Sequence, residues 1–197
     1  MSTVKVVNLQ HPDAASPAVS LDSSGAVSSL AGFTSAGLLQ VVHTKFDTPT
    51  LINANQNSYV DVPNFTGSIT PSSASSKILI FLSVSFGAHI TGGYMISFAV
   101  KKNGSIVSPP SSFGQRVPAH IATEVSDSNN WQYNVQHASA LIMDTPNSTS
   151  QQTYQVAATH NVSGEAWNLY VNRSNFDYDD PQNARAVSTL TLAELAV

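Results

Sequence analysis

Three aspartates near the end of the sequence are the residues whose types and spacing come nearest to a metal site. Asp177, Asp179 and Asp180 lie in the stretch NFDYDDPQNAR. Carboxylate oxygens at alternate positions can chelate Ca²⁺, but this stretch lacks the glycine and the glutamate that an EF-hand loop has at its sixth and twelfth positions. A calcium site and an ordinary acidic loop both stay open, and we expect the ordinary loop.

Six histidines and several carboxylates are the other candidates for chemistry. No two histidines lie close together in the sequence, so the closely spaced pair typical of zinc sites is absent, although histidines that meet in the fold or around a three-fold axis stay open. Glu124, Asp127 and Glu165 would have to converge to act as the carboxylate pair of a glycosidase, and no pattern places them together. There is no nucleophile elbow and no phosphate-binding loop. We expect neither an enzyme nor a bound cofactor.

Aromatic residues in polar stretches point to binding instead. Trp131, Tyr133, Phe176 and Tyr178 lie among asparagines and other polar residues. Exposed aromatic rings beside amides are typical of surfaces that contact carbohydrate or protein. The alternative is that these rings close the ends of a β-sandwich or pack in a subunit interface.

The composition indicates that strands and turns position these residues. Charged residues make up only 10% of the 197 residues, against about a quarter in ordinary domains, whereas hydrophobic residues make up 42%. A surface of hydroxyls and amides suits strands better than helices, which carry Glu, Lys and Arg at i,i+4 spacing. The net charge is −4 and the longest basic run is Lys101-Lys102. Neither nucleic acid nor an anionic membrane is therefore an expected partner.

The sequence contains no cysteine, so burial rather than disulfides must stabilise the core. The first residues lack the apolar segment of a signal peptide, and the longest apolar run is about half a membrane span. We expect a protein that is made in a cytosol and is not inserted into a membrane.

The clearest strand follows the polar turn TPSSASSK. One of its faces is wholly apolar and consists of Ile78, Ile80, Leu82, Val84 and Phe86. The other face is apolar at Leu79 and Phe81 and ends in serines. This pattern predicts a central strand that is buried along one side and for half of the other.

Further strands are predicted at 38–46, 58–63, 94–100, 138–144, 153–160, 165–172 and 184–197. Asn103-Gly104 is the dipeptide that a two-residue type I′ hairpin turn requires. Residues 109–131 are too polar for a core and predict a long loop. With no amphipathic helix in the sequence, the expected fold is an all-β antiparallel jelly-roll sandwich over residues 38–197.

Residues 1–37 are small, polar and poor in aromatics, and they predict a separate segment. The stretch SPAVSLDSSGAVSSL predicts two short strands around the turn Asp22–Gly25. So little apolar bulk cannot form a domain alone, so the segment must pair with copies of itself or with another protein. A flexible tail is the alternative.

Residues 38–197 resemble phage-encoded jelly-roll domains related to the complement globular head and the tumour-necrosis-factor fold. The resemblance lies in SITPSSASSKILIFLSVSF, the upstream TPTLINANQNSYVDVPNFTG, the hairpin ISFAVKKNGSIV and the ending RAVSTLTLAELAV. It implies a homotrimer around a three-fold axis and a role in a virion. It also implies that one stripe of the closing strand serves the core or trimer contact: Val187, Thr189, Thr191, Ala193 and Leu195.

The stretch VNLQHPDAASPAVSLDSSGAV is similar to the start of tail-fibre-like and other surface proteins of phages that infect marine bacteria and cyanobacteria. This similarity implies attachment to other virion proteins through the apolar residues of the segment: Val4, Val6, Val7, Leu9, Val19, Leu21, Val27 and Leu30. We expect a non-enzymatic short fibre or spike on the virion surface, assembled in the host cytoplasm, that displays its head towards a host-surface glycan or protein. The alternatives are a capsid decoration protein and, from another class, a carbohydrate-binding or depolymerising module.

Overall fold

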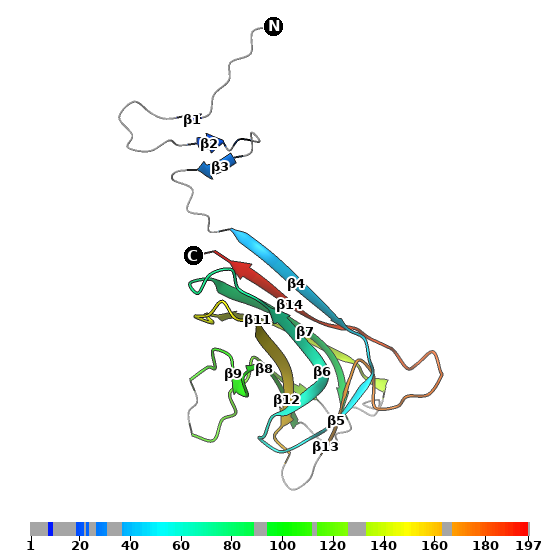
Figure 1. The fold of residues 1–197 in the computed structure, drawn as a ribbon. Coiled ribbons are helices and arrows are strands. Elements are labelled where there is room, and N and C mark those ends of the chain that lie inside the picture. Colours follow the sequence, from blue (N-terminus) through cyan, green and yellow to red (C-terminus); the bar gives the residue numbers. More distant parts are fainter. Residues whose placement is uncertain are drawn as a thin grey trace. The chain divides into compact units, whose positions relative to one another are not determined.

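The computed structural model describes residues 8–9, 19–21, 23, 27–30, 37–88, 94–111, 114–125, 133–162 and 167–196. Their regular secondary structure is β-strand throughout, as predicted from the sequence. The chain forms a small unit within residues 1–37 and a large unit at Leu38–Ala196. Figure 1 shows the path of the chain.

The small unit contains three short strands. They are β1 (Asn8–Leu9), β2 (Val19–Leu21) and β3 (Val27–Leu30), paired antiparallel in the order β1-β2-β3. The two strands predicted around Asp22–Gly25 are β2 and β3.

The large unit contains eleven strands among the residues that the structure describes. Their bounds are β4 Leu38–Phe46, β5 Thr50–Ala54, β6 Val60–Ile69, β7 Lys77–Ala88, β8 Tyr94–Lys102, β9 Ser105–Ile106, β10 Ile121–Val125, β11 Gln136–Asp144, β12 Gln152–His160, β13 Trp167–Val171 and β14 Ser188–Leu195.

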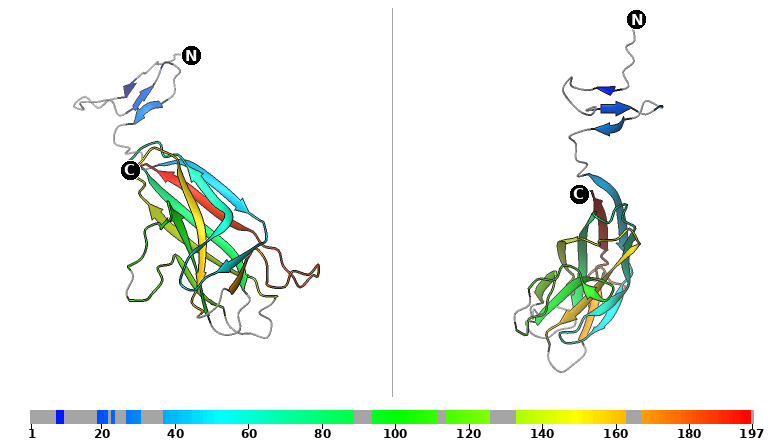
Figure 2. Two further views of the ribbon diagram at one scale, coloured as in Figure 1. Left: turned by 60° about the horizontal axis from the view of Figure 1, so that its bottom comes forward. Right: turned by 60° about the vertical axis from the view of Figure 1, so that its left-hand side comes forward.

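These strands form two antiparallel sheets (Figures 1 and 2). The β4 sheet has the order β4-β14-β7-β11, with β13 and β5 continuing from the far end of β7. The β6 sheet has the order β6-β12-β8-β10, with β9 beside β8. If β5, β9 and β13 are left out, eight strands remain, and they can be numbered 1 to 8 along the chain. The β4 sheet then has the order 1-8-3-6 and the β6 sheet the order 2-7-4-5. This arrangement is that of a jelly roll, so the predicted fold class is confirmed.

The core lies between the two sheets. The five apolar residues of the predicted inner face of β7, Ile78 to Phe86, are all essentially inaccessible to solvent. Aromatic rings join the sheets at two points: Phe46 stacks on Phe65 with centroids 4.6 Å apart, and Phe86 contacts Phe98 at 5.0 Å. Burial of each such side chain contributes about 1.5–3 kcal/mol to folding, so this interior is the main source of stability.

The hairpin and the closing strand form as predicted. Asn103 and Gly104 both have positive φ, 52° and 79°, as a type I′ turn between β8 and β9 requires. The closing segment is a strand, β14, and not a helix.

Two expectations about burial are wrong. Phe81, on the second face of β7, is 44% exposed, because it lies on the face of the β4 sheet that is turned away from the core. The predicted loop 109–131 contains a strand, β10, whose Ile121 is buried in the core. In β14 the core residues are Leu190 and Leu192, and the alternate stripe, which was expected to serve the core or trimer contact, faces away from the core.

Candidate interaction surfaces

The outer face of the β4 sheet carries two rows of uncharged side chains across four strands. The first row consists of Val41, Ala193, Leu79 and Met143. The second row consists of His43, Thr191, Phe81 and Leu141. We call these eight residues the apolar outer face. In Figure 1 the strands that carry them, β4, β14, β7 and β11, lie side by side.

The large side chains of this face are exposed in the single chain. Leu141 is 65% exposed, Val41 51%, and Phe81 44%. Scattered exposed apolar residues are ordinary, but adjacent ones in register across four strands form a patch of the kind that marks an interaction site. The sequence signal for this patch is present in β4 and β11, since both have apolar residues at consecutive positions and so on both faces.

The apolar outer face has no formal charge. Two lysines border it: Lys45, in the following row, is paired with Asp47 at 2.6 Å, and Lys77 of β7 lies in the row before Leu79. His43 Nδ1 lies 2.8 Å from the hydroxyl of Thr191, its neighbour in the second row. The eight residues themselves bring no like charges together when two copies meet.

The stripe of β14 expected to serve the core or trimer contact contributes to this face. Thr191 and Ala193 lie within it, with Thr189 and Leu195 on the same side of the strand, all half-buried. Val187 precedes the strand and is 44% exposed. The stripe therefore faces away from the core, and its use in a trimer contact stays a prediction.

Three of the four predicted contact aromatics form a cluster. The rings of Tyr133 and Phe176 meet edge to face at 5.4 Å, and those of Phe176 and Tyr178 lie 5.3 Å apart. Tyr178 is 65% exposed, whereas the other two are half-buried. Trp131 lies outside the described residues. The cluster thus has two packed rings, Tyr133 and Phe176, and one ring open to solvent, Tyr178.

Two of the three aspartates form contacts with nearby residues of the chain. The carboxylate of Asp177 forms ion pairs with Arg185 and, at 3.6 Å, with Arg173. Asp180 accepts a hydrogen bond from the backbone N–H of Gln182 at 2.8 Å, and Asp179 is exposed. In the described ranges no three histidine, aspartate or glutamate side chains gather as metal ligands.

Two buried or half-buried histidines hold loops in place. His120 accepts a hydrogen bond from Val100 N–H at Nδ1 and donates from Nε2 to Val107 O, 2.7 Å away. His160 accepts at Nδ1 from Val162 N–H and donates from Nε2 to Ala54 O at 2.8 Å. In both rings, both nitrogens are therefore engaged by backbone groups. Burial lowers the pKa of His120 below its usual value, opposed by the bond to Val107.

The remaining candidates are only partly described. Glu124 is an exposed residue of β10, while Asp127 and Glu165 lie outside the described residues, so no convergence of the three is defined. Of the expected attachment residues, Leu9 lies in β1, Val19 and Leu21 in β2, and Val27 and Leu30 in β3. Val4, Val6 and Val7 lie outside the described residues. The part of the chain that the structure describes has no helix able to cross a membrane.

Comparisons with known proteins give structural neighbours but no sequence relatives. No protein-family model matches the sequence, and no curated protein matches it. Solved structures of VP2 protein from infectious bursal disease virus are similar to it. The structure of the Gx strain virus is 15% identical over 92% of this chain, with a TM-score of 0.35, and that of D431N mutant VP2 in T=1 particles is 11% identical over 80%, also at 0.35. The chain spans about two fifths of the length of these proteins, 42% and 40%.

Proposed function

We propose that this chain is a non-enzymatic structural protein of a phage virion, a homotrimeric short fibre or spike that is attached by its N-terminal segment and displays a jelly-roll head. The single observation that carries this proposal is the apolar outer face. A surface built from Val41, Phe81 and Leu141 at their observed exposure is suited to burial between subunits.

Copies of the same chain are the partners that this face fits best. Its eight residues carry no formal charge, and the one hydroxyl among them, that of Thr191, lies between His43 and Phe81, so the face is compatible with itself. Further copies of the chain would also supply pairing partners for the small unit. Its strands are only two to four residues long, and such short strands need pairing beyond their own sheet. Association of three chains would bring three such units together.

A virion location is supported by the resemblance of the sequence to phage surface proteins. The proposal is tested on purified phage particles from the natural host, with antibodies raised against the head. Gold label at the tail would support the fibre or spike, whereas label over the capsid would indicate a decoration protein. Particles that lack the protein altogether would overturn the virion role.

A carbohydrate-contacting role is the second candidate, and the cluster of Tyr133, Phe176 and Tyr178 favours it. An exposed ring such as that of Tyr178 can stack on the C–H face of a sugar. Glycan-array binding that is lost in Tyr178→Ala would support this role. Array binding that is unchanged in this variant would exclude the cluster as the contact.

A further inference from the structure

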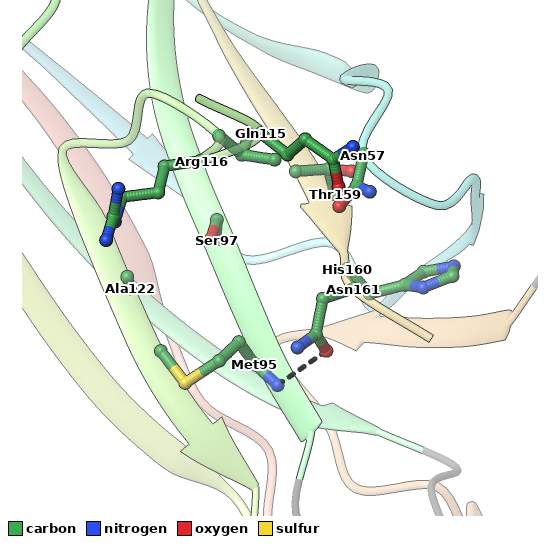
Figure 3. A pocket seen from close by; sticks show the side chains of 10 residues that line it. Asn57, Met95, Ser97, Gln115, Arg116, Ala122, Thr159, His160 and Asn161 are labelled. Atoms are coloured by element: carbon green, nitrogen blue, oxygen red, sulfur yellow. Dashed lines mark hydrogen bonds between the residues drawn. The ribbon is translucent and has the colours of Figure 1, made fainter. Parts of the chain in front are cut away.

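A hollow of about 420 Å³ lies on the outer face of the β6 sheet, away from the surfaces described above. This volume is within the range of roughly 300–1,000 Å³ typical of small-molecule sites. The hollow is bounded by strands β8, β10 and β12, by the segment 115–117 and by Asn57 (Figure 3).

Small side chains on the outer face of the sheet create the hollow. Ser97 of β8, Ala122 of β10 and Thr159 of β12 form its floor. They alternate with residues that fill the core, such as Ile96 and Phe98. At this place in the sheet, the side chains that face the core are therefore large and those of the floor are small.

The wall above this floor is held in position by side chains outside the hollow. His120 bonds to the backbone at Val100 and Val107, and the hydroxyl of Tyr59 donates to Pro118 O at 2.8 Å. These bonds fix the chain directly after the short segment that carries Gln115 and Val117. A site fixed in this way loses little conformational freedom when a ligand enters.

The polar groups around the hollow include both donors and acceptors. Asn57 has a left-handed backbone, φ 53°, set by its N–H bond to His160 O at 2.8 Å, and its side chain is exposed. Asn161 accepts a bond from Met95 N–H through Oδ1 at 2.9 Å, which leaves its NH₂ group to donate. The hydroxyl of Ser97 can both donate and accept a hydrogen bond. Figure 3 shows these residues around the hollow, with the bond between Asn161 and Met95 dashed.

Two charged residues of opposite sign lie near the hollow in the part of the chain that the structure describes. Arg116 lines it on the β10 side, as Figure 3 shows, and Glu124 of β10 is the cross-strand partner of Met95 at its other end. One cation and one anion favour an uncharged ligand over an acidic or basic one. Met95, Val117 and Ala122 add an apolar patch among the polar groups.

We propose that this hollow binds one neutral sugar unit of a glycan. Sugar hydroxyls both donate and accept hydrogen bonds, which matches the amides of Asn57 and Asn161 and the hydroxyl of Ser97. The C–H face of the ring packs on Met95. This inference goes beyond the proposed function and does not depend on it, because the site lies within one chain and needs neither a trimer nor a particle.

The test is saturation-transfer NMR of the full chain with methyl glycosides of glucose, galactose, mannose and N-acetylglucosamine, and with glucuronic acid as the charged comparison. At least one neutral glycoside should bind with a millimolar dissociation constant. Asn57→Gly keeps the left-handed backbone but removes the amide, and it should weaken binding about three- to tenfold, the loss expected for one or two hydrogen bonds. Ala122→Leu fills the hollow from an exposed position and should abolish binding.

The matched control is Asn64→Gly, which makes the same substitution at another exposed asparagine of positive φ, 61°, outside the hollow. Its affinity should equal that of the unchanged protein. Three results would overturn the proposal: no neutral glycoside binds, glucuronic acid binds more tightly than all of them, or Asn57→Gly binds as well as Asn64→Gly. Because Asn57→Gly adds no bulk and keeps the backbone conformation, the test does not depend on whether Ala122→Leu folds.

Discussion

The carboxylate of Glu194 accepts hydrogen bonds from both the backbone N–H and the hydroxyl of Ser72, at 2.7 and 2.6 Å. Gln40 Nε2 donates to the other oxygen at 2.5 Å. These hydrogen bonds connect the polar turn before β7 to the closing strand, since Ser72 and Glu194 are 122 residues apart in the sequence. They also connect the closing strand to β4 through Gln40. Glu194 is fully covered from solvent on the same side of β14 as Leu190 and Leu192, so a buried carboxylate joins this strand to the turn.

Acid should weaken the hydrogen bonds to the Glu194 carboxylate in a defined range of pH. Burial alone would raise the pKa of Glu194, but the hydrogen bonds, led by that from the Ser72 side chain, outweigh it and lower the pKa from 4.5 to about 2. The folded state therefore holds the ionised form more strongly than the unfolded state does. The resulting stability is fully present above pH 4.5 and is lost as the pH falls towards about 2.

Thermal unfolding of Glu194→Gln should show a lower melting temperature at neutral pH and a smaller loss of stability between these two pH values. The matched control is Glu124→Gln, a change at an exposed glutamate of β10, which should behave as the unchanged protein does. Equal acid sensitivity in Glu194→Gln and the unchanged protein would mean that other carboxylates govern this range.

His120 should make the protein less stable just below neutral pH. Its folded-state pKa is lowered from 6.5, chiefly by burial, so the unfolded chain binds a proton first as the pH falls. Stability is therefore complete above pH 6.5 and declines below it. Urea titrations at several values between about pH 7 and pH 5 should show this slope, and His120→Gln should reduce it. The control His137→Gln, at an exposed position of β11, should keep it.

A charge in the apolar outer face should separate the subunits without unfolding them. Leu141→Glu changes a side chain that is 65% exposed in the single chain, so the fold should remain while the association is lost. Sedimentation velocity should show one species at the size of a single chain. Thr153→Glu puts the same charge on the exposed side of β12 in the other sheet, and it should leave the association intact. Association that survives Leu141→Glu would place the contact elsewhere.

Removal of residues 1–37 should leave a folded head that no longer attaches to particles. The core of the large unit is built from residues between Phe46 and Leu192, so its melting temperature should change little. Circular dichroism checks the fold, and co-sedimentation with particles checks attachment. A truncated chain that fails to fold would show that the small unit is part of the head's stability.

The sequence was sufficient to predict the fold because its strongest signals are local. The alternation from Ile78 to Phe86 and the Asn103-Gly104 turn each depend only on neighbouring residues, and both are present as predicted. Strand β10 was missed because it is short and lies within a polar stretch, although its Ile121 is buried. Its identity as a strand depends on β8 beside it, and so on distant residues.

The surfaces were harder to predict for a physical reason. The hydrophobic pattern of a strand is the same whether an apolar residue faces the core or another molecule. For this reason Phe81 was predicted to lie in the interior. Glu194 made one stripe of β14 look mixed, because its partners Ser72 and Gln40 are distant in the sequence. The aromatic cluster likewise joins Tyr133 to Phe176 only through the fold.

The central claim, that three copies associate through the apolar outer face, is tested most directly by the native mass of the full chain in solution. Light scattering coupled to size exclusion should give three times the 20.8 kDa of one chain. The mass should stay constant on dilution across the micromolar range. A single peak at the mass of one chain would contradict the claim.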